Sequence, residues 1–580
     1  MSVCPVVPSD VMPAAVEPAG LDLLGGGGMV AVRVEELCSP AGVGLGKDGR
    51  TALVAAGAAG RIRSGDVVVF CKPVVVAKAV VRRDGRVQAA GHPADHARLG
   101  VAEQQLDALS GTPGLIDDVA AAVSLKGKVK GKARRAMTAA LAIRFTLLMT
   151  LMPQADYPQV LAALLGDLAG VPWRRPFQTP TATVISTWRE AVGPEPLQRV
   201  RDRVLAAVSA EHQQCDWRAV RVGDLDVCAI DGSLVRTPDT PANRAAFGSA
   251  GTADDSAPYP QLRELRLTDA STRSTLAVVT GPSGAAAGGD RDKGQAEQVL
   301  LDKALTDQPA GVFTPNRVWL MDRNFPGVPR IARMLATGTH VLIRLKNGIT
   351  LPRTGEFAPD GSYPATISGG GATLAMRVVE YTVNIAGTDT GELFCLITDL
   401  HDDTTYPAEV LAEAYHWRWI GSETTLKEAK SAINGAGPST GAILRSGCPA
   451  LIAQEHPAWV TAVELTRAVT RAAAALATPA VKGRRAGKPV HPREISFTAA
   501  RRAVITTTRT GTATASLPTP LTTANQHTTL TELARRRVTI DRDRHRERKT
   551  KARPGFPPAG PHPPTHTAPA HITICTPLAA

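Results

Sequence analysis

The chain has 580 residues, a hydrophobic fraction of 43% and a formal net charge of +13, from 66 Lys and Arg against 53 Asp and Glu. This apolar content excludes a wholly disordered chain, and at roughly 150 residues per domain the length predicts about three or four domains. The positive charge weakly favours a polyanionic partner, because net charge bears on association and solubility rather than on fold.

The eight cysteines are scattered along the chain and form no CxxC pair. Their spacing therefore predicts neither a disulfide framework nor a structural zinc site. The opening residues, MSVCPVVPSD, lack the charged and apolar regions of a secretory signal.

Residues 1–95 are rich in Gly and Val, and short runs such as MVAVRV and DVVVFCKPVVVAKAVV are typical of strands between glycine turns. The composition fits a small β module and a poorly ordered extension equally well. No residue here stands out as a chemical site.

Residues 100–215 have helical periodicity. A basic run, Lys126 to Arg135, precedes an apolar helix between Met137 and Met152. That helix is too short to span a bilayer and carries Arg144 in its middle, so we predict a buried core helix.

The two helical patterns that follow, YPQVLAALLGDLAG and PTATVISTWREAVG, are joined by a short basic linker. The second should begin at Pro180-Thr181 and end at Gly193-Pro194. The pair could be a DNA-binding helix-turn-helix or part of an ordinary helical bundle.

From residue 222 the pattern alternates between strands and helices, which predicts an α/β core. DLDVCAI is a strand ending at Asp231, and NRVWLM is a strand ending at Asp322. Residues 347–400 read as β hairpins, and helical periodicity returns between Pro407 and Lys430.

Past Ile433 come a Gly/Ser/Pro loop, an apolar helix near 457–477, and a basic run from Arg535 to Arg553. The basic run could be a DNA arm or a solvated tail. The Pro/His-rich end is predicted to be disordered.

Three acidic residues could form a two-metal site: Asp231, Asp322 and Glu423. The carboxyl ends of strands in open α/β sheets are where ligands collect. Three carboxylates from two strands and a helix can hold two Mg²⁺ ions for phosphodiester displacement. Each Asp alone is weak evidence, because an Asp at a strand end is more often a turn residue.

The neighbourhood of Glu423, YHWRWIGSETTLKEAKS, contains Tyr415, Arg418, Glu423 and Lys430. This resembles the Y-R-E-K signature of the insertion-sequence-four family of DDE transposases. DGSLVRTPDTPANRAAFG resembles the first-aspartate block of that family, and MDRNFPG resembles the second. The resemblance covers roughly residues 100–510.

One spacing departs from the family pattern, which has three residues between the Arg and the Glu. Here four intervene, so Glu423 and Lys430 are turned by about 100° relative to Tyr415 and Arg418 on an ideal helix. We therefore predict a local distortion at Gly421-Ser422, as a π-bulge or as a short break with Ser422 as a new cap.

The resemblance implies roles for these residues. Asp231, Asp322 and Glu423 would be catalytic and hold two Mg²⁺ ions, with Mn²⁺ as a substitute, and Tyr415, Arg418 and Lys430 would bind DNA phosphates. Trp417 or Trp419 could stack a displaced base or pack in the core. Arg323 and Asn324 could position the strand, or stabilise the turn and support Asp322.

The resemblance also implies the architecture, an α/β RNase H-like catalytic core interrupted by a β-rich insertion domain, with a helical N-terminal domain. The expected boundaries are an extension at 1–95, a DNA-binding helical domain at 100–215, core at 222–345, β insertion at 346–402, core with the Glu helix at 403–510, and a tail at 511–580.

The implied function is cut-and-paste DNA transposition by a homodimer acting on double-stranded DNA, namely the element's terminal inverted repeats and its target, in the bacterial cytoplasm at the nucleoid. Two alternatives stay open: a nuclease on the same fold without strand transfer, and a decayed or domesticated DNA-binding protein without catalysis.

Overall fold

The computed structural model describes two compact units, treated separately below: residues 1–108, 112–196 and 501–532, and residues 109–111, 197–500 and 533–580. The residues described are the backbone of six strands between 30 and 89, then 97–99, 101–125, 138–166, 178–212, 220–249, 259–284, 296–307, 309, 311–346, 349, 351–385, 392–418, 421, 424–429, 442–479, 481, 486–509, 523–538 and 570–575.

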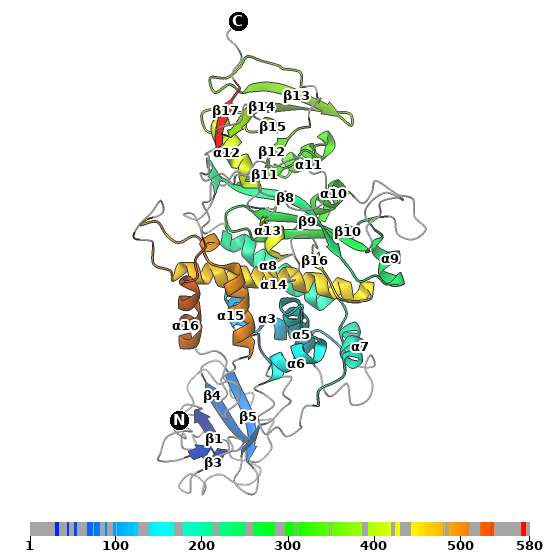
Figure 1. Cartoon of the computed structure of the whole chain (residues 1–580), viewed down its shortest axis with the longest axis vertical. Helices are drawn as coiled ribbons and strands as arrows, with labels where there is room; N and C mark the ends of the chain where they lie inside the picture. The colour runs from blue at the N-terminus through cyan, green and yellow to red at the C-terminus, as the bar shows by residue number, and fades with distance from the viewer. Residues whose placement is uncertain are drawn as a thin grey trace, which may run out of the picture. The chain divides into compact units, whose positions relative to one another are not determined.

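The start of the first unit forms small β sheets (Figure 1). One has the order β1-β4-β5-β6, and a second pairs β2 with β3. Of the two possibilities for residues 1–95, the described strands match the β module. Their bounds are β1 (Val30–Arg33), β2 (Val43–Leu45), β3 (Ala52–Val54), β4 (Val67–Lys72), β5 (Val75–Val81) and β6 (Val87–Ala89).

The rest of the first unit is helical, as predicted. Its central helix, α5 (Ala139–Leu151), contacts α3, α6 and α7, and all its residues except Ala140 are buried. The prediction of a buried core helix is therefore confirmed. The other helices are α2 (Val101–Ser110), α3 (Leu115–Ala121), α6 (Tyr157–Leu165), α7 (Ala182–Val192), α15 (Phe497–Arg509) and α16 (Thr523–Ala534).

The arginine within α5 is buried but charge-paired. The Arg144 guanidinium donates to both carboxylate oxygens of Asp117, at 2.8 and 2.9 Å, and to the carboxylate of Glu103. These two partners raise the pKa of Arg144 against the opposing effect of burial. Pairing makes the burial of this charge tolerable.

Helix α7 has the bounds that the sequence predicts, with Thr181 as its N-cap residue and Gly193 at its C-cap. Helix α6 begins at a capping box formed by Asp156 and Gln159. The linker residues Arg174 and Arg175, and the basic run Lys126 to Arg135, lie outside the described residues, so the helix-turn-helix stays a prediction.

The second unit is built on a mixed sheet of eleven strands, which confirms the predicted α/β class. Its main path is β10-β9-β8-β11-β12-β15-β14-β13, and β7, β16 and β17 pair at its edges. The strands not bounded elsewhere are β7 (Arg221–Val222), β8 (Leu225–Arg236), β9 (Gln261–Asp269), β10 (Thr275–Pro282), β11 (Arg317–Met321), β12 (His340–Arg344) and β16 (Ala442–Ile443).

The β-rich segment predicted at 346–402 forms β13 (Tyr363–Gly369), β14 (Ala372–Ile385) and β15 (Glu392–Thr398). These strands are not a separate sheet, because β15 pairs antiparallel with β12 and extends the core sheet. β17 (Ala570–Ile574) pairs with β14. The prediction of a disordered tail at 511–580 is therefore wrong for this strand and for α16.

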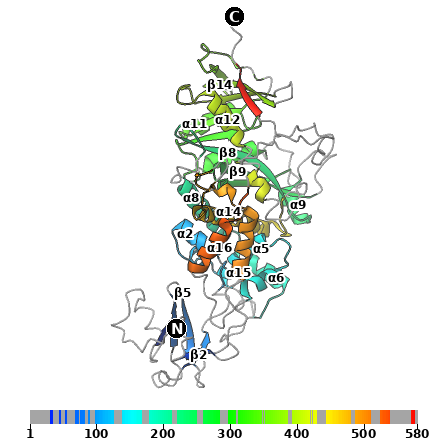
Figure 2. The same cartoon turned by 60° about the vertical axis from the view of Figure 1, so that its left-hand side comes forward.

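One face of the sheet is covered by α12 (Ala408–Arg418), which contacts β8, β11 and β14 (Figure 1, Figure 2). The remaining described helices of the unit are α8 (Glu195–His212), α9 (Pro241–Phe247), α10 (Glu297–Asp307), α11 (Val328–Ala336), α13 (Thr424–Lys427), α14 (Pro449–Ala475) and the 3₁₀ helix Pro492–Glu494. Because α8 belongs to this unit, the helical domain ends near 196 rather than at 215. None of the described helices combines the length and apolarity needed to cross a bilayer.

Candidate functional site

Two parallel neighbouring strands bring the predicted aspartates together. Asp231 lies within β8, Asp322 follows β11, and the pair Leu320–Ala229 precedes them by two residues in the register. If that register continued for two more residues, Asp322 would lie opposite Asp231, with both side chains on one face of the sheet. Both residues are half-buried.

The turn after Asp322 supports its carboxylate. The backbone N–H of Asn324 donates to Oδ1 of Asp322 at 2.7 Å, and the Asn324 side-chain amide donates to Oδ2 at 3.3 Å. Of the roles considered for Asn324, these hydrogen bonds match support of the Asp322 carboxylate. Arg323 is exposed.

Helix α12 brings Tyr415 and Arg418 to the aspartates. Its inner residues share a buried cluster with Ala229, Leu320 and other residues on the same sheet face. The Tyr415 hydroxyl donates to the carbonyl oxygen of Met321 at 3.3 Å, and Nη1 of Arg418 lies 3.7 Å from Oδ2 of Asp231. Burial raises the pKa of Tyr415 to about 12.

Of the two residues where the sequence predicts a distortion, Gly421 is described and Ser422 lies outside the described residues. α12 ends at Arg418, α13 begins at Thr424, and Gly421 between them is π-helical. A Cβ at Gly421 would lie 3.0 Å from Cα of Ala270 and 3.5 Å from Cβ of Ala229. The helix joint therefore packs directly on β8, two residues before Asp231.

Three of the predicted site residues lie outside the described residues: Glu423, Lys430 and Trp419. Of the predicted triad, the structure therefore describes only the two aspartates. Among the residues the structure does describe, no three His, Cys, Asp or Glu side chains are grouped so as to hold a metal ion.

Trp417 is half-buried and packs against the hydrophobic cluster beneath α12. The Arg493 guanidinium lies over its ring, 4.5 Å from the centroid. These contacts match the core-packing role, one of the two considered for this side chain.

A third carboxylate near the aspartates was not found from the sequence. Glu297 begins α10, and its Oε1 lies 3.4 Å from Nη1 of Arg263 on β9. A Cβ at Gly232, the residue after Asp231, would lie 2.1 Å from the Glu297 carboxyl carbon, so the Glu297 side chain occupies the space beside this glycine. The neighbouring Gln298 donates from its amide to the carbonyl oxygen of Asn324.

The electrostatics of Glu297 reflect this position. Its pKa is raised by burial and then by the negative charges of Asp231 and Asp322, against the opposing effect of Arg263. The strand ends thus carry a concentration of negative charge. A Glu in the first turn of a helix is common, which is why the sequence alone gave no signal.

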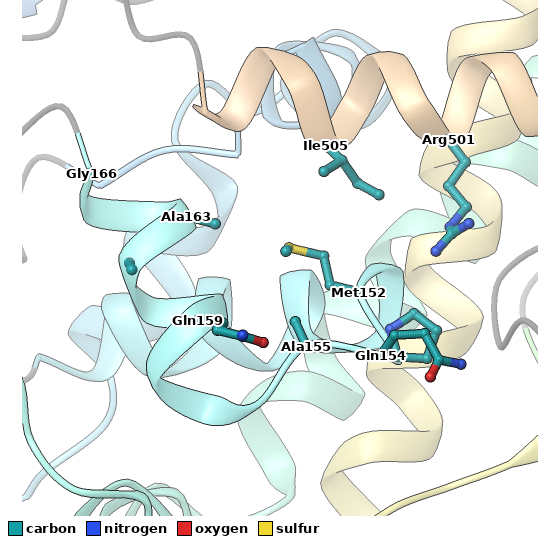
Figure 3. A pocket seen from close by; sticks show the side chains of 10 residues that line it. Met152, Gln154, Ala155, Gln159, Ala163, Gly166, Arg501 and Ile505 are labelled. Atoms are coloured by element: carbon teal, nitrogen blue, oxygen red, sulfur yellow. The ribbon is translucent and has the colours of Figure 1, made fainter.

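The first unit contains a cavity of about 780 Å³ (Figure 3). None of the predicted site residues lines it. Arg501, whose side chain donates to the carbonyl oxygen of Leu151, points toward it. Its lining residues are Met152, Pro153, Gln154, Ala155, Gln159, Ala162, Ala163, Gly166, Arg501 and Ile505.

Comparison with known proteins gives matches to transposases. Residues 223–435 match the family model described as transposase DDE domain. Over 311 residues the chain is 25% identical to the transposase InsG for insertion sequence element IS4 of Escherichia coli strain K12. That alignment covers 51% of this chain and 62% of the relative.

Among solved structures, the chain is similar to a cryo-EM structure of the piggyBac transposase synaptic complex with hairpin DNA. The TM-score is 0.38 at 12% sequence identity, over 74% of this chain and 85% of the other. A TM-score of this size does not define a shared fold.

Proposed function

We propose that the chain is a DNA transposase of the insertion-sequence-four type that excises and inserts an element by cut-and-paste, a proposal that the match of residues 223–435 to the transposase DDE domain model supports. The observation that carries this proposal is the alignment of Asp231 and Asp322 on neighbouring parallel strands, with Arg418 at 3.7 Å from Asp231. The mixed sheet around these strands supports an RNase H-like core.

A divalent cation fits the residues that surround the aspartates. Half-buried carboxylates on adjacent strands repel one another, and oxygen ligands suit Mg²⁺ or Mn²⁺. The pKa of Glu297 is raised by burial first and then by the negative charges of Asp231 and Asp322, against the opposing effect of Arg263. We propose that Asp231, Asp322 and Glu423 hold two such ions, which would polarise the phosphate and activate the attacking oxygen.

The reaction has two displacements. First, water attacks a phosphorus at the element end, the P–O3′ bond breaks, and a free 3′-hydroxyl is released. Then that 3′-hydroxyl attacks a phosphorus of the target DNA and displaces another 3′-oxygen. Arg418 is suited to hold the scissile phosphate, because a guanidinium donates two parallel N–H bonds to phosphate oxygens. Lys430 would add a single positive charge that binds a DNA phosphate.

Tyr415 acts chiefly as a positioning residue in this proposal. Its ring is buried, and its hydroxyl bonds to the backbone immediately before Asp322. Because its pKa is about 12, the phenol stays protonated at neutral pH and keeps the hydrogen that it donates to Met321. Bringing two element ends together would require a homodimer on the DNA.

The test uses the full-length protein, labelled DNA carrying the element's own ends, and Mg²⁺. We expect cleavage at the ends followed by joined products in a target plasmid. Glu423→Ala should abolish both and leave end binding intact. Cleavage without joining would favour a nuclease, and binding without cleavage in Mg²⁺ or Mn²⁺ would favour a non-catalytic DNA-binding protein.

A further inference from the structure

A third charged side chain, Arg344, lies near the two aspartates, on the strand next to β11. β12 is parallel to β11, and its register pairs Ile343 with Met321. Continued by one residue, this register would set Arg344, the last residue of β12, opposite Asp322, the residue after β11. Since the β8–β11 register, continued in the same way, would set Asp322 opposite Asp231, the order across the three strands is Asp231, Asp322, Arg344.

These three side chains share a face of the sheet. Two residues earlier in the same register are Ala229, Leu320 and Leu342, all fully buried in the cluster beneath α12. Successive side chains of a strand alternate between faces, so residues two apart share one. Arg344 therefore extends from the face that α12 covers, at the edge where the carboxylates lie.

An aromatic ring holds the Arg344 side chain. Its guanidinium carbon lies 3.9 Å from the centroid of the Phe394 ring, which is 8% exposed. That ring is stacked on Tyr381, with centroids 5.0 Å apart and planes 18° apart. A guanidinium that uses its flat face against an aromatic ring keeps its N–H groups in the plane, directed outward as donors.

The positive charge of Arg344 also acts on a residue of this site. Tyr415 is influenced by Arg344, Arg418 and Asp322 together, which places all three charges around one phenol. Arg344 is half-buried, so its charge is less screened than that of an exposed residue. Two cations thus flank the two aspartates, Arg418 beside Asp231 and Arg344 on the side of Asp322.

We propose that Arg344 is a DNA-binding residue of this site, contacting a backbone phosphate of the strand being cut on the Asp322 side of the scissile bond. The inference rests on the proposed function and adds to it a second phosphate anchor. With one arginine at each side of the carboxylates, the strand would be held at two points and the phosphorus between them fixed in line for attack.

The test measures binding of DNA ends in Ca²⁺ by wild type and Arg344→Ala. Losing one phosphate contact should lower the magnitude of the slope of log K against log[salt] by about 1. Arg344→Lys should retain the slope, since it keeps the charge, but bind more weakly because the fork is lost. Arg353→Ala is the matched control: Arg353 also stacks on a phenylalanine, 4.6 Å from Phe357, and bridges to β13 at the far end of the sheet path.

A second readout separates phosphate contact from a structural role. Each phosphate near the cleavage point is replaced in turn by a neutral methylphosphonate. At one position the replacement should weaken wild-type binding at least fivefold and leave Arg344→Ala binding unchanged. If every replacement weakens both proteins equally, or the salt slopes match, Arg344 is not a phosphate contact. Wild-type protein that neither binds nor cuts the ends would instead overturn the proposed function.

Discussion

At the scale of single residues, the site combines carboxylates whose mutual repulsion costs stability. Glu297 is the clearest case, since burial and two aspartates raise its pKa. A raised pKa means that the folded chain holds this proton more tightly than the unfolded chain does. Its effect on stability is therefore small below the usual Glu pKa, grows unfavourable as pH rises from the usual Glu pKa to the folded pKa, and levels off above the folded pKa.

We predict that Glu297→Gln raises the Tm of the metal-free protein, because an uncharged amide replaces a carboxylate beside Asp231 and Asp322. The gain should grow as pH rises above the usual Glu pKa and then level off. Thermal unfolding from pH 4 to 8 measures it, with exposed Asp307→Asn on the same helix as control. A gain that is independent of pH, or equal in the control, would contradict this explanation.

The two aspartates could be predicted from the sequence because each follows a short apolar run that reads as a strand. Glu297 could not, since nothing local shows that α10 begins against Gly232. Arg344 was likewise missed: HVLIRLK predicts a strand, but only the parallel pairing of β12 with β11 sets its arginine beside Asp322.

At the scale of elements, Gly421 lies between α12 and α13, in the segment where the extra residue is expected to distort the helix. Gly421 lets the joint between these helices approach the sheet, where a Cβ would lie 3.0 Å from the Ala270 backbone. Gly421→Ala should therefore push the following residues, including Glu423, away from the aspartates.

We expect Gly421→Ala to cost about 1–3 kcal/mol of stability from overpacking and to lower cleavage more than end binding. Gly447→Ala is the control, because its nearest contact for an added Cβ is an ordinary 3.7 Å to Thr240. Chemical denaturation and single-turnover cleavage measure the two effects. Unchanged cleavage in Gly421→Ala would show that the joint does not set the position of Glu423.

In the helical unit, α5 depends on one buried ion cluster. Arg144→Met would leave the Glu103 carboxylate, 5% exposed, without its strongest partner. We predict a loss of about 3–5 kcal/mol in denaturant unfolding of this unit, largely recovered by adding Glu103→Gln and Asp117→Asn. A loss below 1 kcal/mol would mean that water reaches the carboxylates.

Long-range strand pairing could not be predicted from the local sequence. AHITI near the chain end looks like part of a Pro/His-rich tail, yet it pairs with β14, nearly 200 residues earlier in the sequence. The β-rich segment after β12 was predicted as an insertion domain, but β15 returns to pair with β12. Local composition carries no information about such partners.

At the scale of the whole molecule, much of the basic sequence lies apart from the carboxylates of the proposed site. The net charge of +13 indicated only a polyanionic partner. The second unit adds carboxylates that lie beside arginines, which suits the proposed substrate, one that is both negatively charged and cut. Much of the remaining basic sequence, such as Lys126 to Arg135, lies outside the described residues, and its role in gripping DNA stays a prediction.

The central claim is that Asp231 and Asp322 act together in cutting and joining DNA. The most direct measurement is a strand-transfer assay with pre-cleaved element ends, comparing wild type with Asp231→Asn and Asp322→Asn. We predict joined products from wild type in Mg²⁺, none from either variant, and the same affinity of all three for the ends within a few fold. Joined products from either variant, or their absence from wild type that cuts the ends, would contradict the claim.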